Sequence, residues 1–159
     1  MKDLVFGELE WDGYGWSSLV DFDFWGSPKK IELRIEAEDK DEKPSEIQRD
    51  SYAEFVKKWD NIKAEVLEAI LQYYQEEREE LGYDVEENEA YPEVDDTEEI
   101  LKMIEPAEMT ICYTDMIEDF YENGRYIAIR FGCSWDEENG FGIILINEEV
   151  EEIGPDTGL

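Results

Sequence analysis

The feature that most constrains the fold is a change in the spacing of apolar residues along the chain. Residues 30–36 read Lys-Ile-Glu-Leu-Arg-Ile-Glu, an alternation of apolar and charged side chains that is typical of a strand with one buried face. Over residues 52–74 the apolar side chains instead recur at spacings of three and four. This spacing places them on one stripe of a helix of roughly two dozen residues. Beyond residue 109 strand-like runs return.

Strands are predicted on both sides of this helix, over residues 4–11, 19–25, 30–36, 109–113, 125–133, 141–147 and, less regularly, 150–153. The chain has no repeated alternation of strand and helix, which disfavours a parallel nucleotide-binding sheet. The order strands–helix–helix–strands predicts a single α+β domain over residues 1–159. Its sheet is expected to be mainly antiparallel, with about six strands and with the long amphipathic helix and a short helix packed on it.

This architecture predicts which side chains are buried between the long helix and the sheet. The expected core residues are Trp59, Val66, Ile70, Ile129 and Ile144. Most of the five tryptophans are expected in the core as well. Trp16 is the exception, because it lies in a glycine-rich stretch beside Tyr14, and we expect it to be exposed and suited to a protein interface.

Acidic residues dominate the charge of the chain, with 45 Asp and Glu against 14 Lys and Arg and a formal net charge of −31. The densest block covers residues 76–99, which hold thirteen acidic residues and one base, Arg78, a net charge of −12. Gly82 is expected to end the long helix, and residues 82–96 to form an acidic loop. Asp95 or Asp96 then caps a short helix over residues 97–104, which Pro106 ends.

This charge excludes several classes of partner. A protein that binds nucleic acid needs clustered Lys and Arg to contact phosphates, and an anionic membrane surface would repel this chain. No stretch approaches the ~20 apolar residues of a membrane span, and the first residues do not resemble a signal peptide. A cytoplasmic protein is therefore expected, with Cys112 and Cys133 as reduced thiols.

The residues for most enzyme chemistries are missing. The sequence has no histidine, which removes histidine-based catalytic triads and zinc sites, and it has no phosphate-binding or nucleophile-elbow motif. We therefore predict no catalytic residue, no cofactor and no metal ligand. Two alternatives stay open: a carboxylate pair of the glycosidase kind, and a calcium loop over residues 21–32. The loop has Trp25 at its fifth position, where an oxygen ligand belongs, and strands where two helices should flank it.

The segment 126–142 carries a resemblance. It contains Cys133-Ser134-Trp135-Asp136-Glu137-Glu138-Asn139-Gly140 between two predicted strands. This run resembles an uncharacterised bacterial family with a Cys-x-Trp-[Asp/Glu]-x-Glu-[His/Asn]-Gly turn, and residues 6–11 and 52–74 are similar too. The resemblance implies a small α+β domain. Because some relatives occur near bacterial polymorphic toxins, it also implies an immunity protein.

The resemblance assigns no binding residue. Asn139 stands where many relatives have histidine, which argues against metal or acid–base chemistry at the turn. A structural role is the simpler interpretation of this segment, with Trp135 in the core and residues 136–140 as a charged hairpin turn.

Together these observations favour an acidic protein-interaction domain, in particular an immunity protein that neutralises a basic toxin or another cationic partner. The alternatives are a housekeeping acidic domain, a carboxylate-based hydrolase and a calcium-binding protein. The interface is expected in the acidic loop, with two tyrosines as anchors among the acids: Tyr83, Glu86, Glu87, Glu89, Tyr91 and Glu93. Reversing the charge of three of these acids, Glu86, Glu87 and Glu89, should slow association without unfolding the protein.

Overall fold

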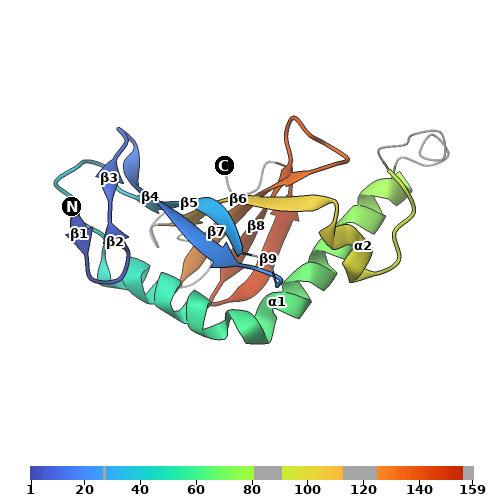
Figure 1. The fold of residues 1–159 in the computed structure, drawn as a ribbon, viewed down its shortest axis with the longest axis horizontal. Helices are drawn as coiled ribbons and strands as arrows, with labels where there is room; N and C mark the ends of the chain where they lie inside the picture. Colours follow the sequence, from blue (N-terminus) through green and yellow to red (C-terminus); the bar gives the residue numbers. More distant parts are fainter. Residues whose placement is uncertain (27, 81–90, 113–124, 156–159) are drawn as a thin grey trace.

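A computed structural model describes residues 1–26, 28–80, 91–112 and 125–155. The protein is an α+β domain in which two helices pack on one mixed sheet (Figure 1). The sheet order is β3-β4-β5-β6-β7-β8-β9, and β1 and β2 form a separate two-stranded hairpin. The elements are β1 (Lys2–Asp3), β2 (Gly7–Glu8), β3 (Glu10–Trp11), β4 (Gly15–Asp23), β5 (Pro28–Glu36), α1 (Glu46–Glu80), α2 (Thr97–Leu101), β6 (Ile104–Ile111), β7 (Tyr126–Cys133), β8 (Phe141–Ile146) and β9 (Glu149–Gly154).

The predicted fold class is confirmed, and one strand pair adds to it. Neighbouring strands of the sheet are antiparallel except for β5 and β6, which run parallel. The chain leaves β5, forms α1 and α2, and returns to the sheet as β6. A connection of this length lets the strand re-enter in its original direction, whereas a short hairpin would force an antiparallel pair.

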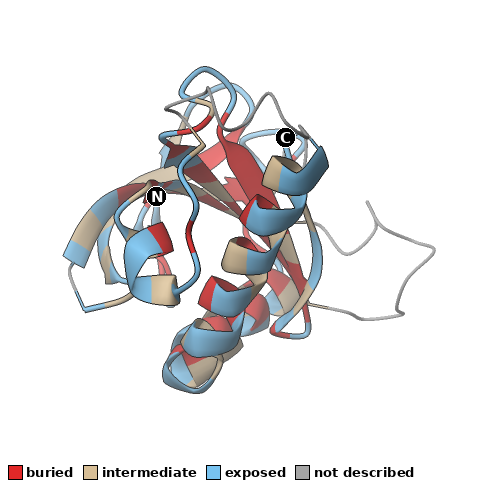
Figure 2. Cartoon of the chain, turned by 90° about the vertical axis from the view of Figure 1, so that its right-hand side faces the viewer, coloured by how far each residue is buried: buried red, intermediate tan, exposed pale blue. Residues whose placement is uncertain are grey.

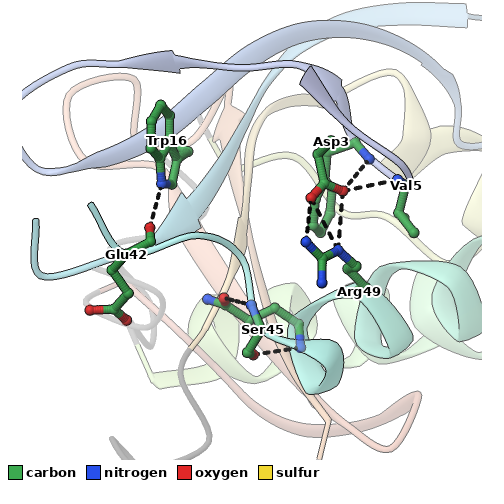
Figure 3. Close-up of polar contacts among 8 residues, drawn as sticks. Asp3, Val5, Trp16, Glu42, Ser45 and Arg49 are labelled. Atoms are coloured by element: carbon green, nitrogen blue, oxygen red, sulfur yellow. Dashed lines mark hydrogen bonds and ion pairs between the residues drawn. The ribbon is translucent and has the colours of Figure 1, made fainter. Parts of the chain in front are cut away.

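The long helix begins earlier than its apolar stripe indicated. Ser45 and Gln48 cap it reciprocally, because the Gln48 main-chain N–H donates to Ser45 Oγ at 3.1 Å and the Ser45 N–H donates to Gln48 Oε1 at 3.0 Å (Figure 3). The first turns carry polar side chains on their buried face, where Gln48 and Ser51 replace apolar residues. The hydrophobic period could therefore not reveal them, and α1 reaches 35 residues.

The helix α1 curves around one face of the sheet (Figure 1). Buried and exposed residues alternate along its turns, so that one side of the helix is buried and the other is exposed (Figure 2). Near the middle, Trp25 donates its indole N–H to the Lys63 carbonyl at 2.9 Å. A side chain that enters the main-chain hydrogen-bond ladder of a helix is a known cause of bending. Trp59 donates in the opposite direction, from α1 to the Phe24 carbonyl at 2.7 Å.

The core prediction is confirmed at four positions and wrong at one. Trp59, Val66, Ile70 and Ile129 are buried. Ile144 is only half-buried, because side chains alternate along β8 and the flanking Ile143 and Leu145 are the buried ones. The register continues this buried row across the sheet through Leu33, Met109, Ile129 and Ile143, and it ends at the half-buried Ile153.

The expectation that Trp16 is exposed is wrong. Its side chain is 7% exposed, it packs edge-on against Trp11, and its indole N–H donates to the Glu42 carbonyl at 2.7 Å (Figure 3). The residue that the glycine-rich turn does expose is Tyr14, at 82%. A turn between two strands thus exposes its tip while the first residues of the strand point inward.

Three element boundaries differ from the prediction. Residues 4–11 do not form one strand, because a turn separates β1 from β2 and β3 follows separately. The short helix α2 begins as expected, with the Asp96 carboxylate accepting from the Glu99 N–H, but it ends at Leu101. Pro106 does not stop that helix and instead lies inside β6, next to a register shift. Proline is tolerated at such an irregularity because the ladder is already interrupted there.

Two buried carboxylates join distant parts of the chain. Asp3, whose side chain is 2% exposed, accepts from Arg49 Nη2 at 2.7 Å and Nε at 3.0 Å, and from the main-chain N–H groups of Val5 and Phe6 (Figure 3). This network, which we call the Asp3 clasp, ties the β1–β2 hairpin to the first turns of α1. It is fully hydrogen-bonded, as a buried charge must be.

The second buried carboxylate is Glu148, in the turn between β8 and β9. Its side chain is 3% exposed and accepts two hydrogen bonds from Arg125 and one from Lys58, each at 2.9 Å. Asn147 and Glu148 both have positive φ, which is the conformation of a tight hairpin turn. This Glu148 clasp links the far edge of the sheet to α1. Among the described residues, no helix is both long and apolar enough to cross a membrane.

Candidate partner-binding site

Residues 91–94 lie along the C-terminal half of α1 as a strap. Three side chains of α1 donate hydrogen bonds to main-chain carbonyls of this strap: Tyr74 to Pro92, Gln75 to Val94 at 2.9 Å and Arg78 to Tyr91 at 3.1 Å. The ring of Tyr91 stacks on that of Tyr74 with centroids 6.2 Å apart. The helix therefore fixes the position of Tyr91 and presents the exposed Glu93 beside it.

The turn that carries the family resemblance lies against the same part of α1. Trp135 is 7% exposed, and its ring centroid is 4.7 Å from that of Tyr74. Asp136 closes the turn, because its carbonyl accepts from the Gly140 N–H at 2.9 Å and its carboxylate from the Asn139 N–H at 3.2 Å. The expected roles of Trp135 in the core and of residues 136–140 as a turn are confirmed.

Gly140 is required at the end of this turn for two reasons. Its φ is +63°, and a Cβ there would lie 2.1 Å from the Phe131 carbonyl oxygen. A side chain at this position would therefore push the turn away from β7.

The strap and the turn bring five titratable side chains together, and we call this group the acid–tyrosine corner: Tyr73, Glu77, Tyr91, Cys133 and Asp136. Burial raises the pKa of both tyrosines, and the neighbouring Glu77 and Asp136 carboxylates raise it further. Burial also raises the pKa of Glu77, with a smaller contribution from Glu80. The shifts share one direction because every neighbour in the corner is neutral or negative.

The corner lacks cations of its own. Within the part of the chain that the structure describes, neither Glu77 nor Asp136 forms an ion pair with a lysine or arginine. Arg78 is adjacent in sequence, but its Nε–H donates to the Tyr91 carbonyl. Arg130 donates to the Asn139 carbonyl at 3.5 Å rather than to a carboxylate, whereas Arg49 and Arg125 contact carboxylates in the two clasps. The corner is thus half-buried negative charge beside aromatic rings.

This arrangement suits the binding of a cation better than acid–base or nucleophilic chemistry. A lysine or arginine side chain would be attracted by the carboxylates and by the faces of the tyrosine rings. Burial raises the pKa of the Cys133 thiol to about 11, so the thiol stays protonated near neutral pH and is a poor nucleophile. No group of three or more Cys, Asp and Glu in the described ranges is placed to hold a metal ion.

The structure describes two of the six partner-binding residues that the sequence predicts. Tyr91 is half-buried in the corner and Glu93 is exposed on the strap. The other four candidates, Tyr83, Glu86, Glu87 and Glu89, lie outside the described residues.

Sequence reasoning did not group Tyr73, Glu77 and Asp136 into one site. The spacing of Tyr73 and Glu77, four residues apart on a helix, was the available signal for that pair. No sequence signal connected Asp136 to them.

The segment considered as a calcium loop has a different structure. Residues 21–32 belong to the β4–β5 hairpin, in which Asp21 lies opposite Lys30. At its tip the Asp23 carboxylate accepts from the N–H of Gly26, which has a positive φ. Strands flank the turn on both sides, so this segment is not a helix–loop–helix.

Comparison with known protein families adds one finding. A family model described as Domain of unknown function (DUF6985) matches residues 5–159. The chain belongs to the DUF6985 family. The expectation that a resemblance to an uncharacterised family covers most of the chain is thereby confirmed, whereas the DUF6985 description names no activity and the immunity role stays a prediction. No curated protein and no solved structure matches the chain.

Proposed function

We propose that the protein is an acidic interaction domain that binds a basic protein through the acid–tyrosine corner and the adjoining strap. The observation that carries this proposal is the half-buried position of Glu77 and Asp136 without an ion pair in the described part of the chain. Carboxylates in such surroundings are stabilised when a cation approaches. Burial raises the pKa of Glu77, with a smaller contribution from Glu80, and no ion pair in the described part of the chain offsets it.

The geometry also supplies anchors for a partner. Tyr73 and Tyr91 are half-buried. The ring of Tyr91 stacks on Tyr74, which packs against Trp135, and the ring of Tyr73 reaches the same group through Phe141. Rigid aromatic residues at the centre of an interface commonly carry much of its binding energy. The surrounding acids of α1, the strap and α2 would mainly accelerate association and exclude acidic partners.

We propose that the basic partner is a toxin domain. The protein would then act as an immunity protein that neutralises this toxin. Two features support this assignment: the net charge of −31, and the resemblance of the Cys133–Gly140 turn to relatives found near polymorphic toxins. The proposal requires that a protein with a basic domain be encoded beside this gene. A gene neighbourhood without one would contradict the immunity role.

The interface is tested by reversing charge at the corner in the variant Glu77→Lys/Glu93→Lys/Asp136→Lys. The matched control Glu8→Lys/Glu10→Lys/Glu151→Lys makes the same change of net charge on other elements. Association of each variant with the neighbouring basic protein is followed by stopped-flow fluorescence at ~0.1 M and ~1 M salt, where the Debye length falls from ~10 Å to ~3 Å.

We expect the corner variant to associate at least about tenfold more slowly at low salt, and the control to change by about twofold. The difference should shrink at high salt, because screening removes the steering contribution. Equal slowing by both variants would indicate an acidic coat without a specific site and would contradict the proposal. Circular dichroism of both variants checks that the fold is intact.

A further inference from the structure

The two edges of the seven-stranded sheet are protected differently. The outer strand β9 carries Glu149, Glu151 and Glu152, all exposed. Charged side chains along an edge strand discourage other chains from pairing with it. At the opposite edge, β3 pairs with β4 only at Trp16 and Ser17. Over residues 18–23, β4 pairs with β5 on one side and with no other strand among the described residues.

This open edge is regular and packs against α1 on its inner face. The pairing of β4 with β5 runs without a register shift from Gly15 to Asp23. On the inner face Phe22 packs against Phe55 and Trp59 of α1, with ring centroids 5.6 Å and 6.0 Å away. Residues 18–23 contain no proline, lysine or arginine. Their charged side chains are the exposed Asp21 and Asp23, which discourage pairing with an acidic chain but not with a basic one.

The side chains on the outer face of residues 18–23 are one apolar residue followed by two acidic ones. Leu19 is 69% exposed, and Asp21 and Asp23 are exposed beyond it on the same side. An added strand that alternates apolar and basic residues would place an apolar side chain near Leu19 and cations near the two aspartates. The edge thus offers main-chain pairing and, beside it, one apolar and two acidic contacts.

We propose that residues 18–23 of β4 bind an extended segment of a cationic polypeptide, which adds to the sheet as an extra strand. Charge selects this occupant over a second copy of the chain, because two copies would each bring a net charge of −31 and would set Asp21 and Asp23 of both edges close together. Strand addition is an established recognition mode for exposed sheet edges. The proposal rests on the edge itself and holds whether or not the acid–tyrosine corner binds a partner.

The test uses a defined probe, an acetylated and amidated peptide of about ten alternating lysine and valine residues. Its control has the same sequence with every amide N-methylated, which keeps the charge but removes the main-chain hydrogen-bond donors on both edges of the peptide. Amide hydrogen exchange of the protein is measured with each peptide. We expect the outward-pointing amides within residues 18–23 to exchange at least about tenfold more slowly with the first peptide and to be unchanged with the second.

Two variants test the same edge by affinity. Leu19→Lys places a charge where the basic strand would lie, and it should weaken binding of the unmodified peptide about tenfold or more. Glu151→Lys makes a larger change of charge at the β9 edge and should leave binding within about twofold.

Three results would overturn the proposal. The first is equal affinity for the two peptides, because main-chain pairing would then not contribute. The second is protection confined to residues 91–99, which would indicate that the peptide binds by charge at the corner alone. The third is a protein dimer in sedimentation whose protected amides are those of β4, because the occupant would then be a second copy.

Discussion

Buried and half-buried acidic side chains near the two ends of α1 differ in whether a cation pairs with them. Near its first turns the Asp3 clasp buries a carboxylate under an arginine, and the Glu148 clasp, on the same half of the helix, adds an arginine and a lysine. At the other end, Glu77 and Asp136 are half-buried without an ion pair in the described chain. In a chain with only 14 basic residues, these cations lie where the fold needs them. The comparison separates acids that hold the structure together from acids that are open to a partner.

The pKa shifts follow this division. Burial alone would raise the pKa of Asp3 and Glu148, but hydrogen bonds from Arg49, and from Arg125 and Lys58, outweigh it and hold both values below the usual range. At Glu77 burial acts without such compensation, so the pKa is raised. Ionisation of the clasp carboxylates therefore stabilises the fold, whereas ionisation of Glu77 costs stability.

The largest effect is expected from breaking a clasp. Asp3→Asn removes the charge that faces Arg49 and should lower the free energy of unfolding by about 2–3 kcal/mol, somewhat less than a fully buried pair because Arg49 is partly exposed. Urea denaturation measures the loss. Asp21→Asn, at an exposed strand position, is the control and should change stability by less than about 0.5 kcal/mol. Equal losses in the two variants would show that the clasp stabilises nothing.

A smaller, pH-dependent effect is expected at the second clasp. The pKa of Glu148 is lowered from 4.5, so its contribution is present above that pH and is lost as the pH falls through the lowered value. Glu148→Gln should therefore cost about 1–2 kcal/mol at pH 7 and much less near pH 3. Denaturation of both proteins across this range gives the difference between them. A difference that stays constant with pH would contradict the role of the ionised carboxylate.

The smallest effect is expected at the corner, with the opposite sign. The raised pKa of Glu77 means that the folded protein holds its proton more tightly, so stability falls as the pH rises through the interval between the unfolded and folded values. At pH 7, Glu77→Gln should raise the free energy of unfolding by a few tenths of a kcal/mol. Thermal unfolding measures this gain, with the variant Glu76→Gln at the exposed neighbouring position as the control. Destabilisation by Glu77→Gln alone would place the residue among the structural acids.

The sequence predicted those structural features that depend on residues close together in the chain. The apolar stripe identified α1, and strand periods and turn residues located β4, β5, β7 and β8 within a few positions. The apolar spacing could not show that Gln48 and Ser51 extend the helix, although Ser45 with Gln48 three residues later is a local pattern typical of a helix start. The burial of Gln48 depends on contacts with other segments, because its amide donates to the Glu36 and Ile111 carbonyls. Trp16 was misjudged for the same reason, since its partner Glu42 is remote in sequence.

The candidate site shows the same limit more strongly. The acidic block and the Cys133–Gly140 turn were each noticed as separate features of the sequence. Their meeting at Tyr73 and Glu77 is a product of packing, because α1 carries the strap on one side and contacts the β7–β8 turn through Tyr74 and Trp135. Residues brought together from three parts of a chain leave no periodic or spacing signal.

The parallel pairing of β5 with β6 also has a consequence for the order of folding. Strands β3 to β5 are linked to one another by short turns, and β6 to β9 are likewise neighbours in sequence. In the described part of the chain, the two groups pair as strands through residues 32–35 and 108–111, and Phe24 and Trp25 also pack on Phe131 of β7. Closing the long intervening chain costs entropy before this contact repays it. We therefore expect each group of strands to pair early and the joint between them to form late, with α1 bridging two half-sheets in the rate-limiting step.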